Sequence, residues 1–153
     1  MKHSSELLVE ASPADVHAVL RDLATYPAWN DLVDEALVDS DTSGDDAPAW
    51  RTTLRAQVGP FARAKQLRFV RVRDISDADR FQTRFERHEL DGRDHANWIM
   101  ETEVQSGGTD EQSMVRLDLT YEGGLWVPTL SSVLGSAIER SVTRLSHYVA
   151  GRG

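Results

Sequence analysis

Apolar and polar residues alternate through most of the middle of the chain, a pattern that is typical of half-buried strands. From Val33 to Glu122 the sequence divides into six such segments, which polar or glycine-containing stretches separate. The pattern predicts an antiparallel meander with one dry face. The positions that share the inward parity are Trp50, Thr52, Leu54, Ala56, Val58, Phe81, Thr83, Phe85, Trp98, Met100, Thr102, Val104, Val115, Leu117, Leu119 and Tyr121.

One strand segment, residues 62–73, does not keep a single parity. Leu67 and Phe69 favour one face of the predicted sheet, whereas Val70 and Val72 favour the other. A β-bulge inserts one extra residue into a strand and so reverses the parity of the residues beyond it. We therefore predict a bulge near Phe69.

The start of the chain changes from a strand pattern to a helical one at Ser12-Pro13. Ser12 is a suitable N-cap, and Pro13 suits the first turn of a helix. The apolar residues that then recur at helical spacing are Val16, Val19, Leu20 and Leu23. Pro27 interrupts this period, and we expect a second, very short helix to follow.

The end of the chain returns to a helical period. From Pro128 to Ala150 a long apolar stripe includes Leu134 and Ile138. Such a stripe must be buried, and the dry face of the predicted sheet is the only large apolar surface available to cover it. We therefore predict an α+β fold in which a seven-stranded antiparallel sheet curves around one long C-terminal helix.

The order of these elements resembles the START-like helix-grip superfamily, specifically its polyketide cyclase/dehydrase and lipid-carrier branch (SRPBCC-type). The most specific resemblance lies in the entry strand, the first helix and an aromatic corner, at residues 11–16 and at Leu20, Asp22, Tyr26, Trp29 and Asn30. The resemblance implies one helix-grip domain over residues 1–153 with an internal cavity for a hydrophobic molecule. It implies no catalytic residue, because no catalytic signature of that family transfers to this sequence.

Composition narrows the class of partner. The 153 residues carry a formal net charge of −8, the wrong sign for neutralising nucleic-acid phosphates. Cysteine is absent, which excludes disulfides and thiolate chemistry and favours a cytoplasmic protein. No stretch has the length of apolar sequence that stable membrane insertion needs. The sequence leaves the oligomeric state open.

The candidate chemistry is sparse. The sequence contains no HExxH, GxSxG, GxGxxG or Walker pattern, so no cofactor is expected. The five histidines do not cluster, and His17 and His147 lie off the apolar stripes of their helices. We therefore expect exposed histidines and no metal site. By parity, the dry face between Trp50 and Tyr121 carries no His, Asp or Glu.

A small hydrophobic molecule is thus the expected partner, and two functions remain open. The first is binding or transport of a lipid, quinone or aromatic polyketide, and the alternative is a polyketide aromatase/cyclase or dehydratase. Arg87 is the sharpest polar candidate, because its parity places a guanidinium beside an apolar wall. Phe61 and Trp126, which follow glycine-containing turns, are candidate gates. The full set of predicted ligand-binding residues is Trp50, Leu54, Phe61, Phe81, Thr83, Phe85, Arg87, Trp98, Met100, Leu117, Tyr121, Trp126, Leu134 and Ile138.

Overall fold

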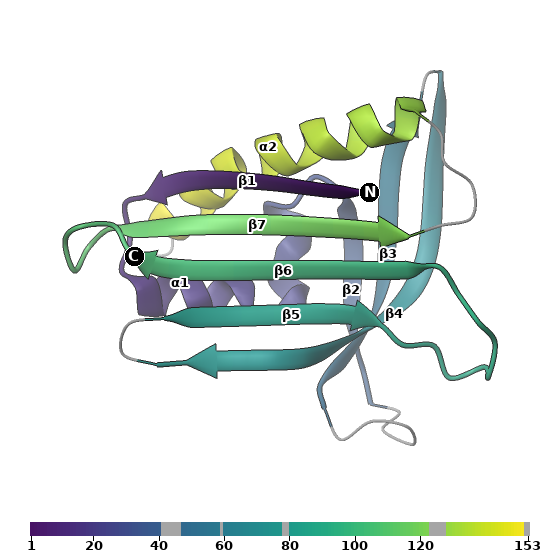
Figure 1. The fold of residues 1–153 in the computed structure, drawn as a ribbon, viewed down its shortest axis with the longest axis horizontal. Helices are drawn as coiled ribbons and strands as arrows, with labels where there is room; N and C mark the ends of the chain where they lie inside the picture. The colour runs from purple at the N-terminus through teal and green to yellow at the C-terminus, as the bar shows by residue number, and fades with distance from the viewer. Residues whose placement is uncertain (41–46, 59, 78–79, 123–127, 152–153) are drawn as a thin grey trace.

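The computed structural model describes residues 1–40, 47–58, 60–77, 80–122 and 128–151. Seven antiparallel strands form one sheet in the order β1-β7-β6-β5-β4-β3-β2 (Figure 1). The strands are β1 (Lys2–Val9), β2 (Val33–Asp39), β3 (Ala49–Val58), β4 (Phe61–Ser76), β5 (Phe81–Arg87), β6 (Asn97–Ser106) and β7 (Ser113–Glu122). The helices are α1 (Pro13–Leu20), the 3₁₀-helix η1 (Leu23–Ala28) and α2 (Pro128–Ala150).

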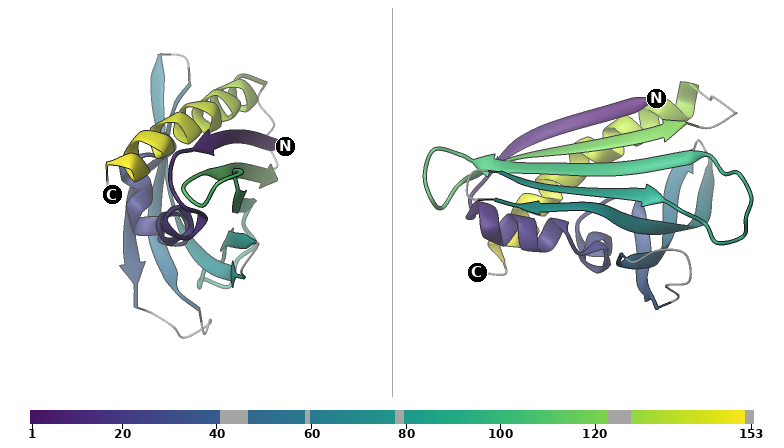
Figure 2. Two further views of the ribbon diagram at one scale, coloured as in Figure 1. Left: turned by 90° about the vertical axis from the view of Figure 1, so that its left-hand side faces the viewer. Right: turned by 60° about the horizontal axis from the view of Figure 1, so that its bottom comes forward.

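The helices lie against the concave side of the curved sheet (Figure 2). The long helix α2 packs on β1, β7 and β3, whereas the short helix α1 packs on β5, β6 and β7. Leu134, Ile138 and Leu145 of α2 are buried in the core that the sheet and helices share. The predicted α+β helix-grip architecture, with two short helices after the first strand, is confirmed.

The aromatic corner after α1 is held by hydrogen bonds to the backbone. Ser12 caps α1 by accepting from the amide of Asp15, as the sequence predicted. The Tyr26 hydroxyl donates to the carbonyl of Leu20 at 2.9 Å, and the buried Asn30 side chain accepts from the amide of Leu32 at 3.0 Å. The interrupted period is itself the second short helix, because η1 contains Pro27.

The bulge in β4 lies further along the strand than the sequence predicted. The pairing of β4 with β5 shifts register between Arg71 and Arg73, so the exposed Val72 is the extra residue. Phe69 and Arg71 stand opposite inward-facing positions of β5 before the bulge. Beyond it, Asp74 stands opposite Thr83, and the inward parity has changed from odd to even numbers.

The inward parity predicted for the other strands is confirmed by burial. Phe85, Val104 and Val115 are completely buried, and Thr52 and Thr83 are buried beside them. Neighbouring outward positions such as Arg116 remain exposed. The core therefore lies between the concave face of the sheet and the two α-helices.

Candidate functional site

Strand register arranges the concave face in rows that run across the sheet. One row lies at the end of the sheet where β5 stops, far from α1 in Figure 1. Register pairs Trp50 with Phe69, Phe69 with Arg87, and Trp98 with Tyr121. We call these five residues the aromatic row. Its rings pack closely, since the ring centroids of Trp98 and Tyr121 are 4.4 Å apart.

The next row toward α1 is apolar, and the one beyond it is polar. Phe85, Met100 and Leu119 pair in register in the first of these rows, and all three are buried. In the second, Thr83 stands directly opposite Thr102. Because α1 packs on β5 and β6, this threonine pair lies under the short helix.

Several buried polar atoms on the concave side have no hydrogen-bond partner among the described residues. They are Trp50 Nε1 and Trp98 Nε1 in the aromatic row, Thr83 Oγ1 and Thr102 Oγ1 in the threonine pair, and His17 Nδ1 on α1. An unpaired buried donor or acceptor costs about 1–3 kcal/mol of folding free energy. Such groups are rare in folded proteins, and their gathering on one internal surface therefore points to a ligand or water that completes them.

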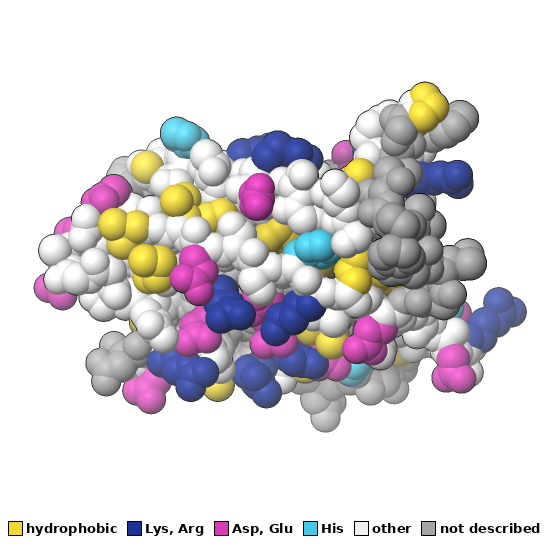
Figure 3. All heavy atoms as spheres, turned by 45° about the horizontal axis from the view of Figure 1, so that its top comes forward, with side chains coloured by type: hydrophobic (Ala, Val, Ile, Leu, Met, Phe, Trp, Pro, Cys, Tyr) yellow, Lys and Arg dark blue, Asp and Glu magenta, His cyan; other side chains and the backbone are white. Residues whose placement is uncertain are grey.

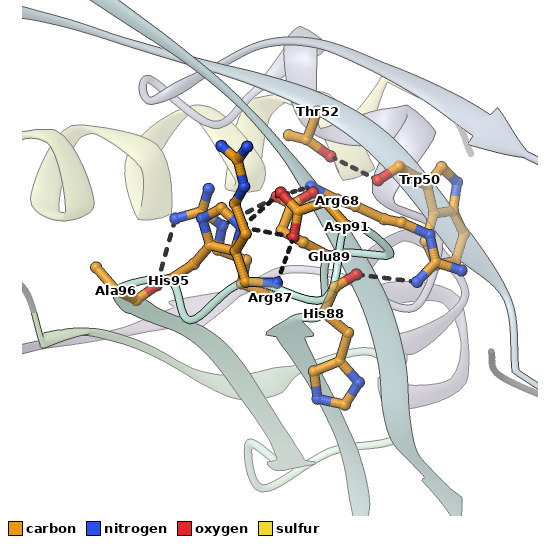
Figure 4. Close-up of polar contacts among 10 residues, drawn as sticks. Trp50, Thr52, Arg68, Arg87, His88, Glu89, Asp91, His95 and Ala96 are labelled. Carbon is orange, nitrogen blue, oxygen red and sulfur yellow. Dashed lines mark hydrogen bonds and ion pairs between the residues drawn. The ribbon is translucent and has the colours of Figure 1, made fainter.

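Arg87, the main polar candidate from the sequence, stands opposite Phe69 in the register of β4 and β5, and it has a carboxylate partner. Its Nε donates to Glu89 Oε1 at 3.0 Å, and its Nη1 donates to the carbonyl of Ala96 at 3.4 Å (Figure 4). The Arg87 side chain is 7% exposed, so the ion pair lies largely out of water. A guanidinium has more N–H donors than these two acceptors use, which leaves Arg87 able to donate further hydrogen bonds.

A second buried ion pair holds the base of the loop after β5. Arg68 Nε donates to Asp39 Oδ2 at 3.0 Å, and Arg68 Nη1 donates to the carbonyl of His88 at 2.9 Å. Glu89 accepts from the amide of Arg68 (Figure 4). The loop that carries Glu89 is therefore tied to β4 and β2, which fixes the carboxylate that meets Arg87.

His17 is buried, contrary to the exposure that the helical pattern predicted. Its Nε2 lies 3.0 Å from Asp74 Oδ1, and its ring centroid lies 5.0 Å from that of Phe81. Asp74 also accepts from Arg21, whose Nη2 donates at 2.7 Å, and the Arg71 guanidinium lies 3.7 Å away. The bulge at Val72 explains the error, because it turns Asp74 toward α1 and gives His17 a partner.

Burial and neighbouring charges shift the pKa values of His17 and Asp74 in opposite directions. Burial lowers the pKa of His17 and outweighs the attraction of Asp74, so the imidazole tends to stay neutral. Burial alone would raise the pKa of Asp74, but the hydrogen bond from Arg21 and the charge of Arg71 outweigh it and lower that pKa. A neutral imidazole beside an ionised carboxylate is the resulting state near pH 7.

Two grooves open beside the concave face. One, of about 500 Å³, runs between α2 and β3 and is lined by residues that include Arg55, Ala56, Val133 and Arg140. The other, of about 250 Å³, lies between α1 and the far end of β4, where Ala14, Asp74 and Phe81 contribute to its walls. Both reach the sides of the core. On the face shown in Figure 3, by contrast, hydrophobic side chains form small separate groups among charged ones.

Most of the predicted ligand-binding residues lie on one surface. The strand positions form part of the concave face, and Leu134 and Ile138 of α2 are buried above it. Phe61 begins β4 instead of lying on a loop, and its side chain is outside the described residues, as is Trp126. The sequence reasoning missed Arg71, Asp74 and His17, since the inward turn of Asp74 depends on where the bulge falls.

No cation site is evident in the described part of the chain, since none of its His, Asp and Glu side chains form a group of three or more that could hold a metal ion. None of the described helices combines the length and the apolar character that crossing a bilayer requires.

Comparison with known proteins establishes the fold. No known family and no curated protein matches the sequence. A START superfamily protein from Mycobacterium smegmatis matches with a TM-score of 0.68 over 99% of both chains at 13% identity. Human StAR-related lipid transfer protein 5 matches with a TM-score of 0.78 over 97% of this chain and 75% of that one, at 9% identity. The Zhui aromatase/cyclase from Streptomyces sp. R1128 matches with a TM-score of 0.67 over 99% and 94% of the two chains, at 14% identity.

These structures share one architecture at low sequence identity. The chain therefore has the START-type, or SRPBCC-type, helix-grip fold that its element order resembled. A fold of this breadth hosts several functions, so the function must be argued from the concave face itself.

Proposed function

We propose that this protein binds a small hydrophobic molecule between the concave face of the sheet and α2. The observation that carries the proposal is the set of buried, unpartnered polar atoms on an otherwise apolar internal surface. Ligand sites in proteins combine apolar walls with a few placed polar groups in this way. Similar structures that include a lipid transfer protein and an aromatase/cyclase are consistent with such a ligand.

The aromatic row supplies hydrogen-bond donors at one end of the proposed site. An indole N–H only donates, and so does a guanidinium. Trp50, Trp98 and Arg87 therefore present donors and match a hydrogen-bond acceptor such as a carbonyl, ester or quinone oxygen. We infer that this end holds the acceptor of the ligand, and that Phe85, Met100 and Leu117 contact its apolar body.

Binding is the function that these groups support best, because hydrogen-bond donors and apolar walls are sufficient to hold a ligand. The proposal is that the protein carries or sequesters a lipid, quinone or aromatic polyketide. It requires no catalytic residue.

The experiment is a titration with a fluorescent carbonyl probe, 6-propionyl-2-(dimethylamino)naphthalene, alongside native mass spectrometry of the purified protein. We expect saturable binding and an emission that reports a hydrogen-bonded carbonyl. Trp50→Phe and Trp98→Phe should each weaken binding about tenfold at most, since each removes one donor and keeps an aromatic ring.

Trp29→Phe is the matched control. Trp29 is also buried, but its Nε1 donates to Thr25 Oγ1 at 3.3 Å in the corner beside η1. Its replacement should lower stability and leave the probe emission unchanged. Absence of saturable binding together with absence of any co-purified ligand would contradict the proposed function.

A further inference from the structure

The polar groups under α1 differ in chemistry from those of the aromatic row. His17, Thr83 and Thr102 each keep a polar atom without a hydrogen-bond partner among the described residues, and each residue is more than nine-tenths buried. Their exposed fractions are 4%, 1% and 6%, respectively. They come from three elements, α1, β5 and β6, which pack together.

The Asp74 carboxylate decides which nitrogen of His17 can accept. An ionised carboxylate only accepts hydrogen bonds, so the His17 Nε2 that lies 3.0 Å from it must carry the proton. In a neutral imidazole the other nitrogen, Nδ1, is then an acceptor. The Arg21 guanidinium holds Asp74 in place through two hydrogen bonds at 2.7 and 3.0 Å.

The threonine pair supplies the complementary chemistry. Thr83 and Thr102 stand opposite each other in register, so their side chains leave the sheet side by side. Each hydroxyl can donate one hydrogen bond and accept others. Thr83 lies two residues from Phe81, whose ring contacts His17. A group that both donates and accepts would satisfy this set, and an alcohol or phenol hydroxyl is the smallest such group on an organic molecule.

We propose that His17, Thr83 and Thr102 form an anchor for a hydroxyl group, so that the ligand is an elongated hydrophobic alcohol or phenol. This inference rests on the proposed function. The anchor lies four residues along β5 from Arg87, a separation of about 13 Å in a strand. The ligand then spans from the anchor, past the apolar row of Phe85, Met100 and Leu119, to the donors of the aromatic row, where its acceptor oxygen binds.

The test compares two probes that differ only at the hydroxyl. They are 6-propionyl-2-naphthol and its methyl ether, 6-propionyl-2-methoxynaphthalene, both titrated by fluorescence at pH 7. Wild-type protein should bind the naphthol about five- to tenfold more tightly, which corresponds to roughly one hydrogen bond. In Thr83→Val and Thr102→Val this preference should fall toward unity, because valine keeps the shape and removes the hydroxyl.

Thr52→Val is the matched control. Thr52 is a buried threonine of the same concave face, on β3, and its hydroxyl already donates to the carbonyl of Trp50. This variant should keep the full preference for the naphthol. Unliganded Thr83→Val and Thr102→Val should also melt at or above the wild-type temperature, since each removes an unsatisfied buried group. A threonine with a purely structural role would instead lower the melting temperature without changing the preference.

The outcomes separate the two proposals. Equal affinity of wild-type protein for the naphthol and its ether would overturn the anchor while leaving the proposed function intact, as would a preference that survives both valine variants. Failure of both probes to bind would count against the proposed function itself.

Discussion

Polar side chains on the outer face of the sheet have partners, whereas several of those on the inner face have none within the part of the chain that the structure describes. On the outer face, charged residues bond to one another within a strand and between strands, as Arg84 of β5 does with Glu86 of the same strand and with Glu101 of β6 at 2.6 Å each. On the inner face, Trp98 and Thr102 of the same strand β6 keep buried polar atoms without partners among the described residues. Glu101 and Thr102 are neighbours on β6, and only their parity places one on the outer face and the other on the inner face.

Folding and ligand binding place opposite demands on the inner polar groups. The outer ion pairs are partly in water, so the charged groups are satisfied by one another and by solvent. The inner groups lower the stability of the unliganded protein unless another molecule completes them. Substitutions on the two faces should therefore differ in their effects on stability and on binding.

The largest effect should follow a charge placed under α2. Ile138 is 3% exposed and belongs to the core, so Ile138→Asp puts a carboxylate into an apolar interface. We expect a loss of about 5 kcal/mol in the free energy of unfolding, measured by denaturant titration. Thr143→Asp adds the same charge on the exposed side of α2 and should change stability little. Equal stability of the two variants would refute the packing of α2 on the sheet.

Next in size is the loss of a buried cation. Arg68→Met leaves Asp39 buried without its closest cation, and we expect a loss of about 3 kcal/mol in the free energy of unfolding. Arg84→Met is the outer-face counterpart, and it should cost less than about 1 kcal/mol because that pair is partly exposed. If both variants lost the same stability, burial would not distinguish the two ion pairs.

Arg87→Met tests the donor end of the site. We expect affinity for 6-propionyl-2-methoxynaphthalene to fall by about 1.5–3 kcal/mol, the scale of a hydrogen bond from a charged group. The same change leaves Glu89 without its partner, so Arg87→Met with Glu89→Gln separates folding from binding. The double variant should regain stability and stay weak in binding. Wild-type affinity in both would place Arg87 in a purely structural role.

The smallest effect concerns acid stability. Because burial lowers the pKa of His17 below its ordinary 6.5, the unfolded chain binds the proton more readily than the folded protein does. Stability should therefore fall as pH decreases through the range just below 6.5, until the folded imidazole is also protonated. His17→Gln should flatten this part of the curve of unfolding free energy against pH. An unchanged slope would show that another group is responsible.

The fold could be predicted from the sequence alone, because strand parity and helical stripes are local patterns of hydrophobic residues. Alternation placed Trp50, Thr83 and Phe85 on the dry face, and the stripe through Leu134 and Ile138 marked α2 with the correct ends. Ser12 and Pro13 marked the start of α1 because capping depends on residues close together in the chain.

The contacts between polar groups, by contrast, could not be predicted from the sequence. The bulge could fall at several positions that satisfy the same apolar pattern, and its place at Val72 turned Asp74 toward α1. That turn, together with strand pairing far apart in sequence, brought His17 beside Asp74 and set Thr83 opposite Thr102. Such contacts depend on register and on the position of a helix over the sheet, neither of which a local pattern of hydrophobic residues contains.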